Sequence, residues 1–289
     1  MRYGIYYAYW TRNWQVDYKE YIYKVKRLGF DLLEMSVIPL IDASDNVLLE
    51  LKNIADSEGL ALTSGYGPSA KHNLGSSDPD IVKNTIDFYR EMFRKLELMG
   101  IHKIGGGVYS YWPVDYSKPI DKEGDWARSV ENVRTVGKLA LEHGIDFNLE
   151  VLNRFEGYLI NTAAEAKKFV EEVDVPSVKI MLDTFHMNIE EDSITEAICT
   201  AGKHLGHVHV GERNRKVPGK GNMPWYEVAA ALRKINYNLD IVMEPFVLMG
   251  GQVGSDIKIW HDISSGASME KLDQDAANSV AFLRHVFEN

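Results

Sequence analysis

Four ionisable residues interrupt apolar runs that have the composition of buried strands. They are Glu150 in FNLEVLN, Asp183 in KIMLDTFH, His209 in GHVHVGE and Glu244 in IVMEPF. A lone carboxylate inside an apolar strand is costly unless it is protonated, paired with a cation or bound to a metal. One such residue is more often an ion-paired or loop-capping group. Four of them at equivalent points of consecutive segments indicate a shared role.

The types of these four residues favour a divalent cation. Three carboxylates and one imidazole that converge repel one another unless a positive charge lies among them. Several oxygen ligands with one nitrogen suit Mn²⁺, Co²⁺ or Mg²⁺ better than a tetrahedral zinc site. The one cysteine, Cys199, falls in a predicted helix and is interpreted as a buried thiol. The pattern therefore predicts one divalent metal bound by Glu150, Asp183, His209 and Glu244.

Short β-rich runs alternate with amphipathic helical segments along the whole chain. In YKEYIYKVKRLGF, for example, the apolar residues recur at helical spacing while lysines cover the other face. The helical patterns tend to stop at glycine, as at Gly29, Gly59, Gly100 and Gly144. The predicted strands are 3–9, 31–36, 60–66, 102–108, 146–151, 178–183, 205–210 and 239–244.

Eight strands, each followed by a helix, predict a single (β/α)8 barrel with residues 1–289 as one domain. A doubly wound sheet would be favoured by a glycine-rich dinucleotide motif after the first strand, and IGGGVYS at 104–110 does not have that spacing. The four candidate ligands fall at the ends of the last four predicted strands. Because barrel enzymes build their active sites at the C-terminal ends of the strands, we expect the active site there.

Composition narrows the possible partners. The chain has 289 residues, of which 45% are hydrophobic, and a formal net charge of −10. An acidic protein is a poor match for nucleic acid or an anionic membrane, since both need clustered lysine and arginine. No apolar run approaches the ~20 residues of a membrane span. The first residues enter a predicted strand directly, which leaves no room for a signal peptide, so the expected location is the cytoplasm.

A divalent ion held by three carboxylates leaves positions for the carbonyl and neighbouring hydroxyl of a ketose, whose adjacent C–H it would acidify. Glu150 and Glu244 lie on strands about 135° apart around an eight-stranded barrel, so they would flank the substrate. Two flanking acids favour epimerisation. One base working on one face would give aldose–ketose isomerisation, which remains open at this point.

The loops after these strands carry further polar residues. Glu156, His186 and Arg215 could bond to sugar hydroxyls, or they could form rim salt bridges such as Arg154–Glu156 and Glu212–Arg215. Aromatic residues near the strand ends could form an apolar wall for the C–H faces of a sugar, or simply belong to the core. These aromatic residues are Tyr6, Trp14, Trp112 and Phe246.

Several longer motifs resemble the D-tagatose/D-psicose (allulose) 3-epimerase family. They are GIYYAYW, YSYWPVDY, EVLNRFE, IMLDTFHMNIEE, VPGKG, VMEPF and GSDIK, and the resemblance spans nearly the whole chain. It implies a TIM barrel with one Mn²⁺ or Co²⁺ that inverts C3 of free ketohexoses through a cis-enediolate. The expected pairs are D-fructose with D-psicose and D-tagatose with D-sorbose. A homodimer or homotetramer is also expected.

The resemblance further implies roles for individual residues. Glu150, Asp183, His209 and Glu244 would bind the metal, and Glu150 and Glu244 would also form the acid/base pair. Residues expected to contact the substrate are Tyr6, Gly107, Trp112, Glu156, His186, Arg215 and Phe246.

The chain departs from the family pattern at a few positions. Val210 and Arg213 stand in HVGERNR where the family commonly has HTGECNR, Gly107 often is alanine, and SVIPL at 36–40 also differs. None of these is a predicted ligand, so the reaction type stands while the preferred sugar stays open.

Four other functions compete. A sugar-phosphate epimerase or isomerase could use Lys220 in VPGKGNMP to bind phosphate. An epimerase of another sugar, such as an L-ribulose 3-epimerase, could use the same metal site. A metal-dependent nuclease would need more ligand histidines and a basic face, and a non-catalytic sugar-binding protein would not need both glutamates.

Overall fold

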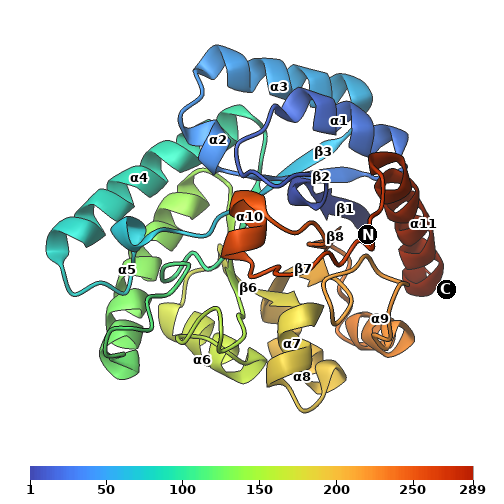
Figure 1. Ribbon diagram of the computed structural model, residues 1–289. Helices are drawn as coiled ribbons and strands as arrows, with labels where there is room; N and C mark the ends of the chain where they lie inside the picture. The colour runs from blue at the N-terminus through green and yellow to red at the C-terminus, as the bar shows by residue number, and fades with distance from the viewer. Residues whose placement is uncertain (289) are drawn as a thin grey trace.

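The computed structural model describes residues 1–288 and shows a closed barrel of parallel strands (Figure 1). Each strand pairs with its neighbours in chain order, and β1 closes the barrel on β8 with Gly4 beside Val242. The strands are β1 (Arg2–Tyr6), β2 (Leu32–Ser36), β3 (Ala61–Gly65), β4 (Lys103–Gly106), β5 (Asp146–Glu150), β6 (Val178–Asp183), β7 (Leu205–Val210) and β8 (Asp240–Met243). The fold is the predicted (β/α)8 barrel.

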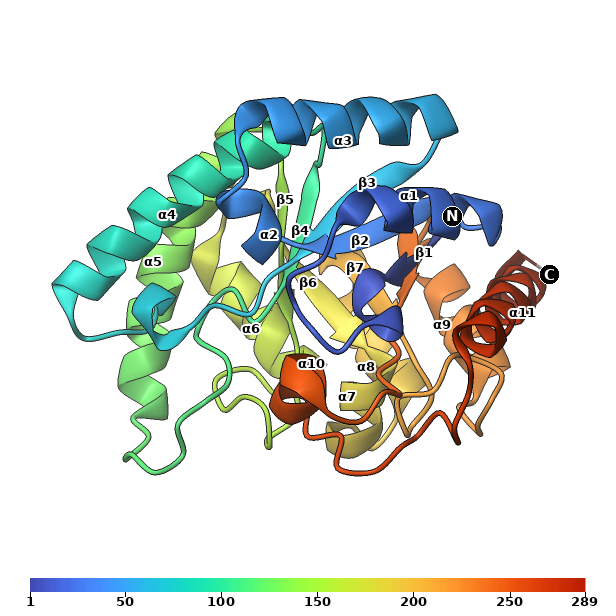
Figure 2. The ribbon, with the colours of Figure 1, turned by 45° about the horizontal axis from the view of Figure 1, so that its top comes forward.

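A ring of helices surrounds the barrel, as Figures 1 and 2 show from two directions. These helices are α1 (Tyr18–Arg27), α3 (Asp45–Glu58), α4 (Pro79–Leu98), α5 (Lys122–Glu142), α6 (Ala163–Val173), α8 (Ile194–Ala201), α9 (Trp225–Lys234) and α11 (Met269–Glu288).

Shorter helices belong to the connections between strands and ring helices. They are α2 (Ile38–Ile41), α7 (Thr184–Glu190), α10 (Gly251–Asp256) and the 3-10 turns η1 (Tyr7–Trp10), η2 (Ala70–His72) and η3 (Gly202–His204). Within residues 1–288 no helix has both the length and the apolar character needed to cross a bilayer.

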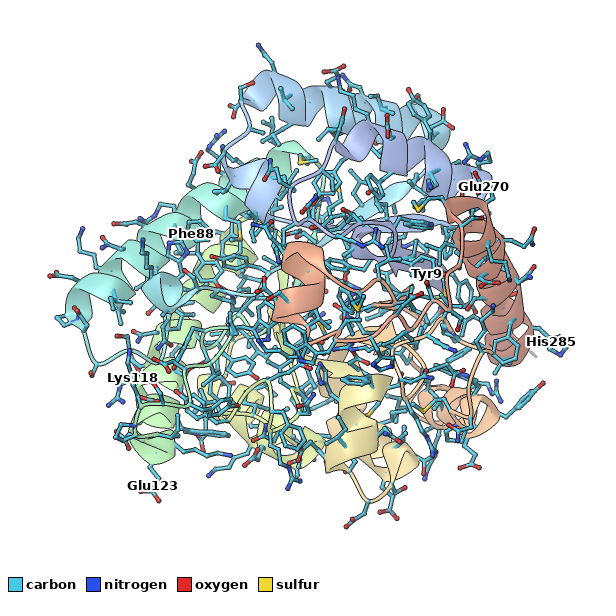
Figure 3. The ribbon with its side chains drawn as sticks, in the orientation of Figure 1. Tyr9, Phe88, Lys118, Glu123, Glu270 and His285 are labelled. Carbon is cyan, nitrogen blue, oxygen red and sulfur yellow. The ribbon has the colours of Figure 1, made fainter. Side chains whose placement is uncertain are left out.

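The ring helices bury one face each. On α1, Ile22 and Val25 are fully buried, and Asp17 caps the first turn by accepting a hydrogen bond from the Lys19 N–H. In Figure 3 the charged side chains of Lys118, Glu123 and Glu270 lie at the outer edge of the molecule. The apolar faces of strands and helices thus form the core between barrel and ring.

An ion cluster forms the floor of the barrel at the seam between its first and last strands. Asp240 of β8 accepts hydrogen bonds from Arg2 of β1 and, at 2.8 Å, from Lys103 of β4. Lys103 and Asp240 are both buried. A buried carboxylate needs such partners, so the seam depends on this pair.

The opposite end of the barrel is partly covered by α10, which lies in front of the strands in Figure 1. Trp14 Nε1 donates a 2.7 Å hydrogen bond to Asp256 Oδ2, and the Val253 N–H donates to the Arg12 carbonyl at 3.0 Å. Gly251 has φ 69°, and a Cβ there would lie 2.3 Å from the Arg12 carbonyl oxygen. Only glycine lets α10 approach this closely.

Candidate active site

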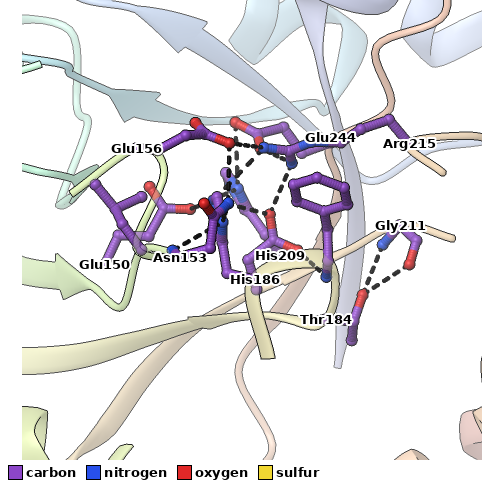
Figure 4. Close-up of polar contacts among 12 residues, drawn as sticks. Glu150, Asn153, Glu156, Thr184, His186, His209, Gly211, Arg215 and Glu244 are labelled. Atoms are coloured by element: carbon purple, nitrogen blue, oxygen red, sulfur yellow. Dashed lines mark hydrogen bonds and ion pairs between the residues drawn. The ribbon is translucent and has the colours of Figure 1, made fainter. Parts of the chain in front are cut away.

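The four predicted ligands converge at the C-terminal end of the barrel. Figure 4 shows Glu150, His209 and Glu244 close together there. Glu150 ends β5, Asp183 ends β6, His209 lies near the end of β7, and Glu244 directly follows β8. One ligand atom from each lies within 4.8 Å of the others. His209 Nδ1 is 3.4 Å from Glu244 Oε1 and 3.9 Å from Glu150 Oε1. Strands distant in sequence therefore build one compact cluster.

The cluster contains ligand atoms whose lone pairs are available to a divalent cation. Glu150 Oε1 and His209 Nδ1 are buried and have no hydrogen-bond partner among the described residues. Buried polar atoms without partners are rare in native proteins and call for an explanation. Ligand atoms about 2.1 Å from one ion lie roughly 3 to 4 Å apart, which matches the spacing around His209. These residues fit a divalent metal.

The pKa shifts of the cluster show how strongly its buried carboxylates act on one another and on His209. Burial raises the pKa of Glu150 well above its usual value, and the carboxylate of Glu244 adds to the rise. Burial alone would lower the pKa of His209, but the carboxylates of Glu244 and Glu34 outweigh it and hold that pKa well above 6.5. The cluster therefore favours a positive charge among its carboxylates.

Asp183 is oriented by the start of α7. Its Oδ1 accepts a 2.7 Å hydrogen bond from the Phe185 N–H, as an N-cap residue does, and its Oδ2 faces Arg215. Thr184 exchanges two hydrogen bonds with the backbone of Gly211, which ties this turn to the end of β7 (Figure 4). The strand-to-helix turn therefore fixes the carboxylate.

Arg215 joins the carboxylates from the side. Its Nη1 donates to Asp183 Oδ2 at 3.0 Å and to Glu244 Oε2 at 2.9 Å, and Glu156 Oε1 lies 3.6 Å from Nη2. The guanidinium carbon lies 3.8 Å from the centre of the Phe185 ring, a cation–π contact. The four carboxyl and guanidinium groups form one connected network.

The backbone of Arg215 is held in an uncommon conformation, with φ 63°. A tight turn explains it, because the Arg215 N–H donates to the Glu212 carbonyl and the Arg215 carbonyl accepts from the Phe246 N–H, both at 2.9 Å. Strain of this kind persists where the surroundings fix it, and it clusters at functional sites.

His186 presents a hydrogen-bond donor to the cavity. Its Nδ1 accepts from the Asn153 backbone N–H at 3.2 Å and lies 2.7 Å from Asn153 Nδ2. These contacts are shorter than the 3.5 Å from Nε2 to Arg215 Nη2, so they place the proton of the neutral ring on Nε2. Burial lowers the pKa of His186 to about 3, which keeps the ring neutral. Its Nε2 is 3.8 Å from Glu150 Oε1.

The local rim salt bridges considered from the sequence do not form. Arg154 makes a two-pronged ion pair with Glu190 instead of Glu156. Glu212 is buried and accepts hydrogen bonds from the backbone of the following loop and from Trp225. Glu156 and Arg215 are therefore free to face the cavity.

A pocket opens above the cluster. Glu150, His209 and Glu244 form its floor, whereas Asp183 is 1% exposed and lies beneath the wall. The aromatic residues singled out from the sequence all belong to the wall, with Trp14 6.4 Å from Trp112 and 6.5 Å from Phe246 between ring centres. Every residue predicted to contact the substrate lines this pocket: Tyr6, Gly107, Trp112, Glu156, His186, Arg215 and Phe246.

Some residues of the site were not predicted. The pocket wall also contains Ser36, Ile38, Tyr66 and Asp256. Glu34 lies beneath the cluster, where it binds His209. The sequence carried a signal for Glu34, because a glutamate inside the apolar strand DLLEMS poses the same question as Glu244 in IVMEPF.

Comparisons with known proteins agree with this geometry. Residues 22–260 match the family model of the xylose isomerase-like TIM barrel. The chain is 58% identical to a D-psicose 3-epimerase of Ruminiclostridium cellulolyticum, over 100% of this chain and 98% of the relative. It is 49% identical to a D-psicose 3-epimerase of Agrobacterium fabrum, over 99% of each chain.

Solved structures give the same result. A crystal structure of D-psicose 3-epimerase with D-tagatose from Clostridium cellulolyticum H10 superposes with a TM-score of 0.99 at 58% identity and covers 99% of both chains. A structure of D-psicose 3-epimerase in the presence of D-fructose superposes with a TM-score of 0.99 at 49% identity and covers 100% of both chains. The chain therefore belongs to the xylose isomerase-like TIM-barrel family and, within it, to the D-psicose/D-tagatose 3-epimerases, and it is an epimerase.

Proposed function

We propose that the protein is a metal-dependent epimerase that inverts C3 of free ketohexoses through a cis-enediolate. The proposed pairs are D-fructose with D-psicose and D-tagatose with D-sorbose. The observation that carries the proposal is the cluster of Glu150, Asp183, His209 and Glu244, three of which form the floor of a pocket walled by aromatic rings. Relatives named for this activity support it, as do their structures with D-tagatose or in the presence of D-fructose.

The same four residues would hold one divalent ion, Mn²⁺ or Co²⁺, with Mg²⁺ as a weaker candidate. Once bound, the ion would supply Lewis acidity toward the ketose carbonyl and its neighbouring hydroxyl. The unpartnered Glu150 Oε1 and His209 Nδ1 support this assignment.

Glu150 and Glu244 would move the proton at C3. One carboxylate would take the proton, the electrons of the broken C–H bond would form the C2–C3 double bond, and the π electrons of the C2 carbonyl would move to its oxygen to give the enediolate. The other glutamate, as a carboxylic acid, returns a proton to the opposite face and so inverts the carbon. Their origin on β5 and β8 supports two different angles of approach.

Three further residues would orient the sugar and stabilise its developing charge. His186 would donate from Nε2, which its bonds to Asn153 leave facing the cavity. Arg215 would hold Glu244 in place through their 2.9 Å contact and add positive charge near the enediolate oxygens. Glu156, 20% exposed in its side chain, would accept a hydrogen bond from a hydroxyl.

An unphosphorylated sugar fits this pocket better than a sugar phosphate. Lys220, the residue considered for phosphate, pairs with Asp275 of α11 and does not line the pocket. Among the described lining residues, Arg215 is the one lysine or arginine, while Asp256 adds a carboxylate at the rim. A phosphate would meet more negative than positive charge there.

Substrate preference provides the test. Epimerisation of D-fructose, D-tagatose, L-ribulose and D-fructose 6-phosphate should be compared with Mn²⁺ present. The proposal predicts turnover of the free ketohexoses and little turnover of D-fructose 6-phosphate. Preferred turnover of the phosphate would contradict it. The homodimer or homotetramer, the single domain and the cytoplasmic location stay predictions from the sequence.

A further inference from the structure

A second layer of polar residues lies inside the barrel beneath the metal cluster. Glu34 of β2 receives three contacts from hydrogen-bonding groups on two other strands. His209 Nε2 lies 2.5 Å from Glu34 Oε1, His207 Nε2 lies 2.8 Å from Glu34 Oε2, and Thr63 Oγ1 donates to Oε2 at 2.8 Å. All four residues are at most 2% exposed. Water does not compete for these contacts.

These contacts fix which nitrogen of His209 carries the proton. Thr63 Oγ1 donates to Glu34 Oε2, and both imidazoles present Nε2 to the same carboxyl group, so Glu34 is the acceptor of all three contacts. His209 Nε2 must then be the N–H. In the neutral ring Nδ1 carries the lone pair, and Nδ1 is the atom that faces Glu150 and Glu244.

We propose that Glu34 is a positioning residue for the metal site, which holds His209 in the tautomer and ring orientation that direct Nδ1 at the ion. A carboxylate behind a ligating histidine fixes the ring and makes the ligand nitrogen more basic. Thr63 and His207 in turn hold Glu34, since both contact its second oxygen. The inference rests on the metal site proposed above.

Glu34, His207 and His209 could instead bind an ion of their own, because their ligand atoms also lie within 4.8 Å of one another. Two features argue against it. The 2.5 Å separation of His209 Nε2 and Glu34 Oε1 is at the short end of hydrogen-bonded contact and below the roughly 3 Å between neighbouring ligands of one ion, so the two atoms contact each other directly. Glu34 Oε2 already has two hydrogen-bond partners, Thr63 Oγ1 and His207 Nε2, each at 2.8 Å, so its lone pairs are occupied without an ion.

The test compares Mn²⁺ binding by wild-type protein and Glu34→Gln after removal of metal with a chelator, with titration calorimetry as the readout. We expect one ion per wild-type chain and an affinity about 10- to 100-fold weaker in the variant. The matched control is Glu212→Gln, which makes the same change at another buried glutamate with three donors but no imidazole. It should lower the thermal unfolding midpoint and keep Mn²⁺ affinity within about threefold of wild type, as expected for a site with no ligand contact.

Two results would overturn the proposal: unchanged Mn²⁺ affinity in folded Glu34→Gln, or two ions per wild-type chain with one lost in the variant. If that variant does not fold, the tautomer of His209 can be measured instead, by ¹⁵N NMR of wild-type protein labelled at histidine and loaded with Mg²⁺. The proposal requires His209 with its proton on Nε2, and a proton on Nδ1 excludes it. A wild-type chain that binds no Mn²⁺ at all would instead refute the proposed function.

Discussion

Two glutamates of this site are each candidates for more than one role. Glu150 and Glu244 are both candidate ligands and candidate proton carriers, and their surroundings differ. Glu150 is 7% exposed and lies beside neutral His186, whereas Glu244 shares a hydrogen bond with the Arg215 guanidinium. A carboxylate next to a fixed cation and one next to a neutral ring respond differently to an approaching proton. The pair is therefore chemically asymmetric.

Replacing either glutamate by glutamine should stop proton transfer while retaining a neutral oxygen ligand. We expect kcat for D-fructose to fall about 10²- to 10⁴-fold in Glu150→Gln and in Glu244→Gln, the range lost with a general acid or base. Steady-state kinetics at saturating Mn²⁺ measures this loss. The exposed Glu227→Gln on α9 is the control and should behave as wild type. A variant that binds Mn²⁺ and keeps a tenth of wild-type kcat would exclude that glutamate as a proton carrier.

Two adjacent glycines at the pocket should respond differently to alanine. Gly106 has φ 123°, and a Cβ there would lie 2.3 Å from the Tyr66 carbonyl oxygen, whereas at Gly107 the nearest atom is Leu152 Cδ1 at 3.4 Å. Gly106→Ala should cost about 2 kcal/mol or more in unfolding free energy. Gly107→Ala should cost less than about 0.5 kcal/mol and retain activity. Denaturant unfolding and kinetics check both, and equal losses would show that this geometry is wrong.

At the scale of elements, α10 and the segment after η1 together form one side of the pocket mouth. Trp14 lines the pocket and holds α10 through Asp256. Replacing Trp14 by phenylalanine keeps an aromatic wall but removes a hydrogen bond to a charged group, worth about 1.5–3 kcal/mol. The mouth should then be less well ordered when substrate arrives.

We expect Trp14→Phe to raise KM for D-fructose by up to about tenfold, with a smaller effect on kcat. Trp10→Phe is the matched control, because the buried Nε1 of Trp10 has no hydrogen-bond partner among the described residues. Initial-rate kinetics over a range of D-fructose concentrations distinguishes them. An unchanged KM in Trp14→Phe would mean that this bond does not organise the mouth.

The seam between β1 and β8 gives a pH-dependent prediction. Burial would raise the pKa of Asp240, but Arg2 and Lys103 outweigh it and lower that pKa below 3.8. A carboxylate whose pKa is lowered on folding stabilises the folded state at pH values above its unfolded-state pKa of about 3.9. This stabilisation is lost as the pH falls through the folded-state pKa.

Asp240→Asn should therefore lower the free energy of unfolding by about 3 kcal/mol at pH 7. The difference in unfolding free energy between variant and wild type should shrink below about pH 4. Urea unfolding at a series of pH values measures this. Asp146→Asn, at the half-exposed Asp146–Lys179 pair of the same barrel end, should cost less than about 1 kcal/mol. A difference that stays constant down to pH 3 would contradict the assigned ion pair.

The elements themselves were predictable from local patterns. The predicted strands agree with the observed ones to within three residues at each end, because apolar runs bounded by glycine identify barrel strands. The main difference is at the first strand, expected to reach residue 9, where the chain turns into η1 after Tyr6. Tyr7 and Trp10 remain buried there, so their apolar character suggested a longer strand than the backbone forms.

Partners across the barrel were not predictable in this way. Local spacing suggested Glu212 as the partner of Arg215, whereas the barrel brings Asp183 and Glu244 to it. Glu34 reaches His209 from a strand 175 residues earlier. Such contacts depend on barrel closure and on side-chain direction, which no short stretch of sequence encodes.

At the scale of the whole molecule, the two halves of the barrel contribute different chemistry to one pocket. The last four strands supply the candidate ligands, while most of the aromatic wall, Tyr6, Tyr66 and Trp112, comes from the first half of the chain and its loops, and Phe246 joins it from the segment after β8. A bound ketose would have its carbonyl end at the polar half and C–H faces against the aromatic half. The pocket would therefore accept its substrate in one orientation.

The most direct test of the account follows deuterium from solvent into the sugar. Chelator-treated protein is incubated with D-fructose in D₂O, with and without added Mn²⁺, and the products are examined by NMR. The account predicts D-psicose with deuterium at C3, formed only when the ion is present. Equal turnover without any divalent ion, or deuterium at C1 with an aldose as product, would contradict it.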